Sequence, residues 1–350
     1  GGPAMIRTLI QGSIDEASHW VACPPDGPYA EVFRRLLGPS RVLGFPLDPA
    51  RVRPDLVHTH GFDAGLLRLP AFLRAVPAVH TFHGFYPAGT GPAGAALRLA
   101  AENLLSPLTR AAVAVSESEK RLAARLCPFL ARKTIVIANG IEPRPAPPPA
   151  PAASQPVRVL AAGRLVRQKH PELALRIAAA CRALDPDLKI EFRLAGAGPL
   201  EASLRRLIHS LGLSSTVQLL GDVRQIGPEL ASAHIYLSTA RWEGLSLALL
   251  EAMHAGLACV ATRVQGNVDA IEHERTGLLF NPASPDEAAR QITALARDPA
   301  ARRAYGLQAQ AEAQARFSAR AMCRQYLDLY RAVLAPAPGG VCPSCARWPS

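Results

Sequence analysis

The sequence predicts an α/β protein of two doubly wound domains, each with a parallel sheet that is covered by helices on both faces. Two observations predict this fold class. Short β-branched runs alternate with helical patterns along most of the 350 residues, and a proline-rich segment, residues 143–156, divides that alternation into two halves. A chain of this length can bury two cores without disulfides or a structural metal.

The first half, residues 1–142, contains five short apolar runs that we interpret as strands. They are Arg41–Phe45, Leu56–His60, Val79–Phe82, Ala112–Val115 and Thr134–Ile137. Helical patterns fall at Tyr29–Leu37, Gly65–Arg74, Gly94–Leu108 and Glu117–Leu126. Strands of this length alternating with helices favour parallel pairing through crossover helices.

Residues 143–156 hold seven of the 32 prolines, too many for a helix or a strand, so we expect a linker between domains. In the second domain, residues 157–316, the predicted strands are Val157–Ala161, Ile190–Ala195, Val217–Leu220, Ile235–Ser238 and Ala258–Ala261. Amphipathic helices fill the gaps between them.

A last helix, residues 317–335, has an apolar face that needs a partner, and we expect it to cross back and pack on the first domain. Residues 336–350 are expected to form a disordered tail. Their Cys342 and Cys345 make a lone CxxC, which is at best half of a zinc site.

Composition excludes several classes of protein. The net charge is +11, but no basic run is dense enough for a nucleic-acid arm, so no nucleic-acid partner is expected. A basic protein is still attracted to anionic membranes, and we retain a membrane surface as a partner to be tested. The seven scattered cysteines indicate reduced thiols and a cytoplasmic protein, peripheral on the inner face of the membrane at most.

The most informative segment follows the predicted strand Ile235–Ser238. Its residues 243–246, Glu-Gly-Leu-Ser, turn into a helix whose free N–H groups and dipole would favour a diphosphate. Glu251 lies eight positions after Glu243, roughly 12 Å along a regular helix axis. Two carboxylates at that distance cannot share a proton, but they can hold hydroxyls on two parts of a long ligand.

A second motif, residues 163–169 (Gly-Arg-Leu-Val-Arg-Gln-Lys), directly follows the strand Val157–Ala161. Arg164 and Lys169 would therefore lie at the same sheet edge as Glu243. Arginine binds phosphate through a bidentate fork and lysine as a point charge, so the two cations would offset the charge of a diphosphate.

Other patterns have ordinary explanations. His58 and His60 are interpreted as hydrogen-bonded structural residues, since no third ligand is close in sequence. Asp185-Pro186-Asp187 is interpreted as a turn rather than a metal-binding D-x-D. Gly196-Ala197-Gly198 lacks the third glycine and the acidic residue of a dinucleotide fingerprint, which argues against a dehydrogenase. No phosphate-binding GxxxxGK[ST] loop or GxSxG elbow is present.

Together these motifs resemble the retaining glycosyltransferases of family 4, which have the GT-B fold of two facing Rossmann-like domains. The resemblance spans nearly the whole chain, and its most specific parts are WEGLSLALLEAM (residues 242–253) and GRLVRQK (residues 163–169). The other matching segments are DLVHTHG (55–61), HTFHGF (80–85), VAVSESE (113–119), IANGIE (137–142), LAGAGPLE (194–201), LLGDV (219–223) and FSARAMCRQYLDLY (317–330).

The resemblance implies transfer of a hexose-type sugar from a UDP- or GDP-sugar to an envelope polysaccharide, exopolysaccharide or lipid-linked acceptor, with retention of configuration. No cofactor and no metal are expected. The residues that the resemblance assigns to catalysis are Arg164, Lys169, Glu243 and His83, where His83 would face the donor sugar. Donor binding is assigned to Gly2, Gly163, Leu220, Val223, Gly244, Leu245, Ser246 and Glu251, with Glu251 on the ribose and residues 220–223 near the base.

By the same resemblance, Gly1-Gly2-Pro3 would be a loop near the diphosphate that follows the first strand of the first domain, so we expect that domain to lack a strand. Family members usually have two glycines ahead of a glutamate at this place. This chain has Gln265-Gly266 ahead of Asp269 instead. We expect these two differences to affect which sugar is preferred. Two alternatives remain open: a nucleotide-sugar-binding module with impaired catalysis, and a GT-B epimerase or phosphorylase.

Overall fold

The computed structural model describes residues 2–27, 29–44, 52–73, 75–84, 91–143 and 155–335. The chain divides into two compact units, the first made of Gly1–Gly140 with Ala319–Ser350 and the second of Ile141–Ser318. Most of the expected linker (residues 144–154) and the expected tail with Cys342 and Cys345 lie outside the described residues.

The second unit is built on a six-stranded sheet with the order β12-β11-β10-β7-β8-β9, in which every neighbouring pair is parallel. Its strands are β7 Val157–Ala162, β8 Ile190–Ala195, β9 Val217–Gly221, β10 Ile235–Ser238, β11 Ala258–Thr262 and β12 Leu278–Phe280. Its helices are α8 Pro171–Leu184, α9 Glu201–Ser210, α10 Gly227–Ser232, α11 Leu247–His254, α12 Asn267–Ala270, α13 Pro285–Arg297 and α14 Pro299–Arg316.

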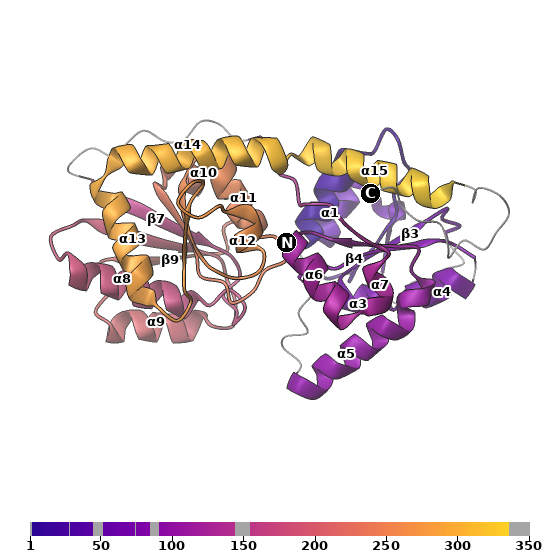
Figure 1. Ribbon diagram of the computed structural model, residues 1–350, viewed down its shortest axis with the longest axis horizontal. Coiled ribbons are helices and arrows are strands. Elements are labelled where there is room, and N and C mark those ends of the chain that lie inside the picture. The colour runs from indigo at the N-terminus through magenta and orange to yellow at the C-terminus, as the bar shows by residue number, and fades with distance from the viewer. Residues whose placement is uncertain are drawn as a thin grey trace. The chain divides into compact units, whose positions relative to one another are not determined.

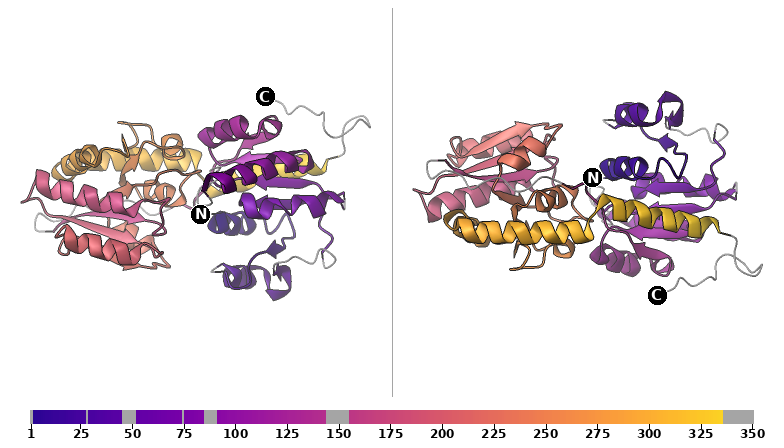
Figure 2. Two further views of the ribbon diagram at one scale, coloured as in Figure 1. Left: turned by 90° about the horizontal axis from the view of Figure 1, so that it is seen from below. Right: turned by 90° about the horizontal axis from the view of Figure 1, so that it is seen from above.

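Helices lie on both faces of this sheet (Figure 2), which confirms the doubly wound α/β class. Strands β10 and β11 are buried along their whole length. On one side α8 packs against α13, and elsewhere α11 packs against α14. Alternate residues of β10 and β11 join one apolar cluster with α8 and α13, and the residues between them are buried as well, so these two strands are continuous apolar runs rather than alternating ones.

The first unit contains a four-stranded parallel sheet of order β3-β4-β5-β6 and a separate two-stranded sheet, β1-β2. The strands are β1 Val21–Ala22, β2 Val42–Leu43, β3 Val57–His60, β4 Ala78–Thr81, β5 Ala111–Ala114 and β6 Thr134–Val136. The helices are α1 Gly2–Gln11, α2 Ala30–Leu37, α3 Gly61–Gly65, α4 Arg68–Leu73, α5 Gly91–Leu105, α6 Glu117–Leu126, α7 Pro128–Ala131 and α15 Ala319–Leu334, with 3-10 turns η1 Pro39–Arg41 and η3 Ser106–Leu108.

The last helix belongs to the first unit, as expected, because α15 packs against α1 (Figure 1). Its apolar face, with Met322, Tyr326 and Leu329, is buried there.

Three expectations for the first unit are wrong. Gly2 opens helix α1 and is not part of a loop. The helix expected at residues 65–74 is divided into α3 and α4 around Leu66 and Leu67. The strand expected from Arg41 is shorter, because Arg41 closes a 3-10 turn and β2 is only Val42–Leu43.

Candidate active site

The strand order of the second unit creates a crevice beside the carboxyl ends of β7 and β10. These strands are neighbours in the sheet, but the chain continues from β7 towards β8 and from β10 towards β11, in opposite directions. At such a switch point the two following loops diverge, and doubly wound proteins bind ligands there. The two motifs singled out in the sequence, residues 163–169 and 243–246, are those two loops.

The loop after β7 is fixed by the loop after β8. The backbone N–H of Gly163 donates to the carbonyl of Ala195 at 2.9 Å, and that of Leu165 donates to Ala197 at 2.9 Å. A Cβ atom on Gly196 would lie 1.9 Å from the carbonyl oxygen of Gly163. Gly196 is therefore needed so that the loop after β8 can pack closely against the backbone of the loop that carries Arg164. This packing explains the glycine without a dinucleotide-binding function.

The loops after β7 and β10 are also bonded to each other. The N–H of Arg241 donates to the carbonyl of Gln168 at 2.8 Å, and the Gln168 side chain donates to the carbonyl of Trp242 at 3.1 Å. The Thr239 hydroxyl donates to the carbonyl of Lys169 at 2.9 Å. These bonds hold the two walls of the crevice in one arrangement without using the Arg164 side chain.

Lys169 and Glu243 form an ion pair across the crevice. The Glu243 side chain is only 8% exposed and that of Lys169 is 24% exposed, so each group largely neutralises the other. The Arg164 side chain is exposed, and no ion pair to it is found among the described residues. Arg164, which lines the pocket beside this loop, thus remains available to an anion.

Helix α11 begins directly after Glu243, Gly244 and Leu245, with Ser246 as its N-cap. The Ser246 side chain makes no capping bond to the helix, so the first-turn N–H groups keep their affinity for an anionic acceptor. A pocket beside this helix start is lined by Gly163, Arg164, Lys169, Thr239 and Ser246. The Leu245 side chain is buried, so only its backbone can serve a ligand.

A third loop supports Glu243 from behind. The N–H of Glu243 donates to the carbonyl of Gln265, and Gly266 follows with a φ of 82°. A Cβ atom on Gly266 would lie 2.7 Å from the carbonyl oxygen of Gly244 and 2.8 Å from the Cβ of Glu243. The second residue of the atypical Gln265-Gly266 pair is therefore required to be glycine, and its N–H is held by the Asp269 carboxylate at 3.1 Å. In the sequence this pair is visible only as a departure from the family pattern.

Glu251 lies in the second turn of α11 and is partly buried. It contributes, after burial itself and the charges of Glu243 and Cys259, to raising the pKa of the Tyr236 phenol well above its ordinary value. Tyr236 therefore stays a neutral phenol, whose hydroxyl donates to the carbonyl of Ala162. The charges of both carboxylates therefore act on Tyr236 in β10. The spacing of roughly 12 Å between them assumed a regular helix from Glu243. In the structure the helix begins only at Leu247, so that spacing does not apply.

Leu220 and Val223 flank the end of β9, at the same edge of the sheet. The carbonyl of Gly221 accepts a bond from the N–H of Gly196 at 2.7 Å, which ties this segment to the loop after β8. Both side chains are partly buried.

Two predicted residues, Gly2 and His83, lie together in the first unit. A Cβ atom on Gly2 would lie 3.5 Å from the His83 ring. His83 follows β4 with a φ of 61°, unusual for a side chain with a Cβ, and its Nε2 lies 3.0 Å from the Nδ1 of His60. Burial lowers the pKa of His83 to about 4, so its ring is neutral near pH 7.

A buried carboxylate holds the backbone around His83. Glu119 is fully buried and accepts bonds from the N–H groups of Gly84 and Val115, which joins the ends of β4 and β5. The VAVSESE segment matches the family, but its Glu119 has no partner that can be identified from the sequence alone. The structure assigns it to holding the strained turn that carries His83.

His58 is a structural residue, as expected. Its Nδ1 lies 2.6 Å from the Tyr330 hydroxyl and its Nε2 lies 2.8 Å from that of Thr81. His60 stacks on His83, with ring centroids 5.2 Å apart. Asp185-Pro186-Asp187 forms the expected turn after α8.

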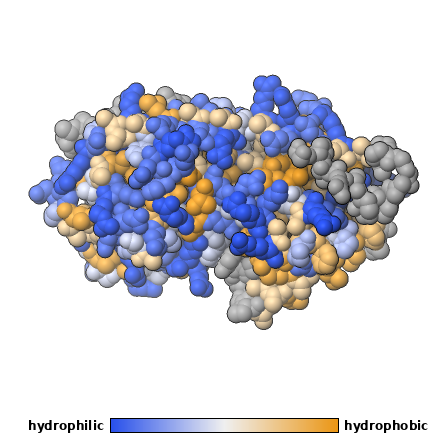
Figure 3. Space-filling model, viewed as in Figure 1, coloured by the Kyte–Doolittle hydropathy of each residue, from blue (hydrophilic) through white to orange (hydrophobic). Residues whose placement is uncertain are grey.

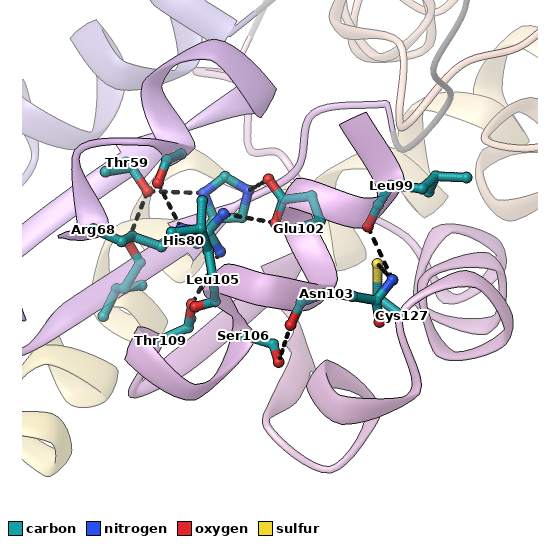
Figure 4. Close-up of polar contacts among 12 residues, drawn as sticks. Thr59, Arg68, His80, Leu99, Glu102, Asn103, Leu105, Ser106, Thr109 and Cys127 are labelled. Carbon is teal, nitrogen blue, oxygen red and sulfur yellow. Dashed lines mark hydrogen bonds and ion pairs between the residues drawn. The ribbon is translucent and has the colours of Figure 1, made fainter. Parts of the chain in front are cut away.

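Sequence reasoning missed a buried polar network in the first unit (Figure 4). The Arg68 guanidinium donates to the Glu102 carboxylate at 2.7 Å and to the Thr109 hydroxyl at 2.9 Å. His80 lies 3.7 Å from the same carboxylate and bonds to the Thr59 hydroxyl at 2.8 Å. Arg68 and His80 are fully buried, so the network is internal scaffolding for β3 and β4.

Within the described ranges, no group of three or more His, Cys, Asp or Glu residues is arranged to hold a metal ion. Each helix in the described part of the chain is too short or too polar to span a membrane.

Two family models match consecutive parts of the chain. "Glycosyltransferase Family 4" matches residues 11–145, and "Glycosyl transferases group 1" matches residues 147–312. Together they cover most of both units, but not the helix α15.

Two of the curated relatives are named as glycosyltransferases. A D-inositol 3-phosphate glycosyltransferase of Arthrobacter sp. is 34% identical over 196 residues, which are 51% of this chain and 46% of that protein. The UDP-Gal:alpha-D-GlcNAc-diphosphoundecaprenol alpha-1,3-galactosyltransferase of Escherichia coli is 28% identical over 243 residues, 65% of this chain and 62% of that protein. The chain thus spans less than two thirds of the length of either relative.

Among solved structures, Alr3699/HepE of Anabaena in complex with UDP-glucose superposes with a TM-score of 0.80 at 19% identity, covering 95% of this chain and 96% of that chain. That similarity concerns the fold. With the two family matches and the site motifs in place, the chain belongs to the family 4 glycosyltransferases of GT-B fold.

Proposed function

We propose that this protein transfers a hexose-type sugar from a UDP- or GDP-sugar to a saccharide or lipid-linked acceptor of the cell envelope or of an exopolysaccharide, with retention of configuration. The proposal is supported by the relatives, whose names specify sugar transfer to inositol phosphate and to a diphosphoundecaprenol-linked sugar. The UDP-glucose complex of HepE supports a nucleotide-sugar donor. We place the reaction in the cytoplasm, at the inner face of the membrane.

The observation that carries the proposal is the convergence of Arg164, Lys169 and the start of α11 at the switch point between β7 and β10. In sugar transfer the bond between the anomeric carbon and the diphosphate oxygen breaks, and the electron pair leaves with the diphosphate. Cations and helix N–H groups aimed at that oxygen stabilise the charge that develops there. A second unit built in this way is suited to hold the diphosphate of the donor.

Glu243 has a second function in this proposal. One of its oxygens is paired with Lys169, but a carboxylate accepts several hydrogen bonds, so it can also accept one from a sugar hydroxyl. Glu251 would accept bonds from the ribose, and residues 220–223 would contact the base. Gly2 and His83 would approach the donor from the first unit, with His83 as a neutral imidazole.

For retention, the acceptor hydroxyl attacks the anomeric carbon from the face that the diphosphate leaves. A new carbon–oxygen bond replaces the broken one, and the hydroxyl proton passes to the departing phosphate. No step requires a metal in this scheme, because Arg164 supplies positive charge, and Lys169 and the first N–H groups of α11 supply hydrogen-bond donors. We therefore expect a chelator to leave turnover unchanged.

The test is replacement of Arg164 by Ala, with release of nucleoside diphosphate measured over a panel of UDP- and GDP-sugars. Loss of one such stabilising group typically costs about 10²-fold in turnover. Arg167→Ala is the matched control, because Arg167 is an exposed arginine of the same loop that does not line the pocket. An Arg164→Ala protein with unchanged turnover would overturn the assignment. Nucleotide binding without turnover in the unmodified protein would favour a binding module.

A further inference from the structure

Helix α5 presents a solvent-exposed face without a charged side chain. Leu97 is 73% exposed and Leu104 is 79% exposed, and the exposed alanines continue the same stripe at helical spacing; they are Ala93, Ala96 and Ala100. The two charged residues of the helix are engaged elsewhere: Arg98 pairs with Asp63, and Glu102 is buried. Figure 3 shows orange and pale orange atoms where Figure 1 places this helix.

The short helix α7, which contacts α5, adds an aromatic side chain to this surface. Phe129 is 72% exposed. The junction is fixed from α5, because the Asn103 amide donates to the carbonyl of Leu126 at 3.0 Å and to the Cys127 sulfur at 3.4 Å. Leu104 and Phe129 therefore flank one anchored junction between helices.

The helix α6, which contacts α7, and the residue after α7 carry exposed arginines. Arg121 and Arg125 are exposed one turn apart on α6, and Arg132 is exposed directly after α7. Across residues 117–133 the acidic side chains are Glu117 and Glu119, and Glu119 is buried. This part of the surface is therefore strongly positive.

We propose that this face, formed by α5, α6 and α7 and here called the α5–α7 face, docks on the surface of an anionic lipid bilayer. Leu97, Leu104 and Phe129 would enter the boundary between headgroups and acyl chains, and the arginines would bind lipid phosphates, as in interfacial amphipathic helices. A second copy of the chain fits this face less well, because a two-fold contact would bring the same arginines towards one another.

The inference about the α5–α7 face rests on the proposed function, because a lipid-linked acceptor lies at the membrane and the enzyme must reach it there. Its residues are distinct from those of the candidate active site. Vesicle binding and donor turnover can therefore fail independently of each other.

The experiment is cosedimentation of the full chain with vesicles of phosphatidylcholine alone and of phosphatidylcholine mixed with phosphatidylglycerol. We expect binding to the mixed vesicles that weakens with salt. The double variant Leu97→Glu with Leu104→Glu should bind at least about tenfold more weakly, since burial of each leucine contributes about that factor. Leu307→Glu is the matched control, an exposed leucine on helix α14 of the other unit.

Because the altered leucines are exposed, the variants should fold, which circular dichroism will check. Leu104→Ser and Phe129→Ser provide milder variants with the same expected direction. Absence of binding to the mixed vesicles, or binding that these changes leave intact, would overturn the proposal. A dimer in sedimentation velocity that Leu97→Glu abolishes would assign the face to a second copy instead. Hydrolysis of a soluble donor should be unaffected by every variant, which separates this test from that of the proposed function.

Discussion

Replacing Gly266 by Ala should impair catalysis, although Gly266 itself is not assigned to donor binding. The φ of Gly266 is 82°, and an L-residue held there costs about 1–2 kcal/mol. The Cβ of an alanine at position 266 would also lie 2.7 Å from the carbonyl oxygen of Gly244 and 2.8 Å from the Cβ of Glu243. The first of these atoms belongs to the backbone, and the second is bonded directly to the backbone. Because such contacts cannot be relieved by rotating a side chain, the segment that carries Glu243 must move.

A displacement of about 1 Å in a positioned group can cost about 10²-fold in rate. We therefore expect Gly266→Ala to lower kcat by roughly 10- to 100-fold, with a loss of about 2–3 kcal/mol in the free energy of unfolding. Diphosphate release under saturating donor measures the first quantity, and denaturant unfolding measures the second.

Gly212→Ala is the matched control. Its φ of 64° is also positive, but an added Cβ would approach only the flexible Arg182 guanidinium, at 3.6 Å. This variant should lose about 1–2 kcal/mol of stability and keep its turnover. If Gly266→Ala keeps the same turnover as Gly212→Ala, the reasoning that links Gly266 to the position of Glu243 is refuted.

Three further predictions concern other parts of the molecule. Glu102→Ala should cost about 3–5 kcal/mol in denaturant unfolding, because it leaves the buried Arg68 charge unpaired, whereas a double change of both residues to apolar ones should cost much less. Burial lowers the pKa of His58 to about 3 and that of His83 to about 4, against an ordinary value of 6.5, so the unfolded chain takes up protons first as the pH falls. These two histidines should therefore leave the free energy of unfolding unchanged above about pH 7 and lower it from about pH 6.5 to 4, by up to about 1.4 kcal/mol per pH unit for each histidine; a flat profile from pH 6.5 to 4 would contradict this expectation. Glu251→Ala should raise the KM for the donor more than it lowers kcat, and a change confined to kcat would argue against ribose binding.

The second unit could be predicted closely from the sequence. The strands β8 and β10 have the bounds that the sequence pattern indicates, because β10 is a buried apolar run and the apolar residues of β8 alternate with Glu191 and Arg193. The positions of Arg164, Lys169 and Glu243 at one sheet edge follow from the same pattern, since carboxyl ends of parallel strands share an edge.

What could not be predicted depends on contacts between distant residues. The pairing of Lys169 with Glu243 joins two loops, and the buried Arg68 and Glu102 come from different helices. The partner of an arginine or a glutamate cannot be identified from a sequence, so each is interpreted by default as a solvated surface residue. The role of Gly266 likewise appears only when the backbone of Gly244 is seen against it.

The first unit was predicted less well because its elements are short. The strands β1 and β2 have two residues each, and α3 and α7 have five and four. A helix of four or five residues is shorter than two turns, and a strand of two residues contains a single alternation. Hydrophobic periodicity therefore cannot identify segments of this length. Their structure is set by packing in the folded unit.

The central claim is that the crevice between β7 and β10 holds the diphosphate of a nucleotide. Isothermal titration calorimetry of the full chain with UDP and with GDP tests it most directly, using the unmodified protein, Arg164→Ala and Arg167→Ala. We expect one of the two nucleotides to bind at one site per chain, with affinity reduced about tenfold or more by Arg164→Ala and unchanged by Arg167→Ala. Absence of binding by either nucleotide, or equal affinity in all three proteins, would contradict the claim.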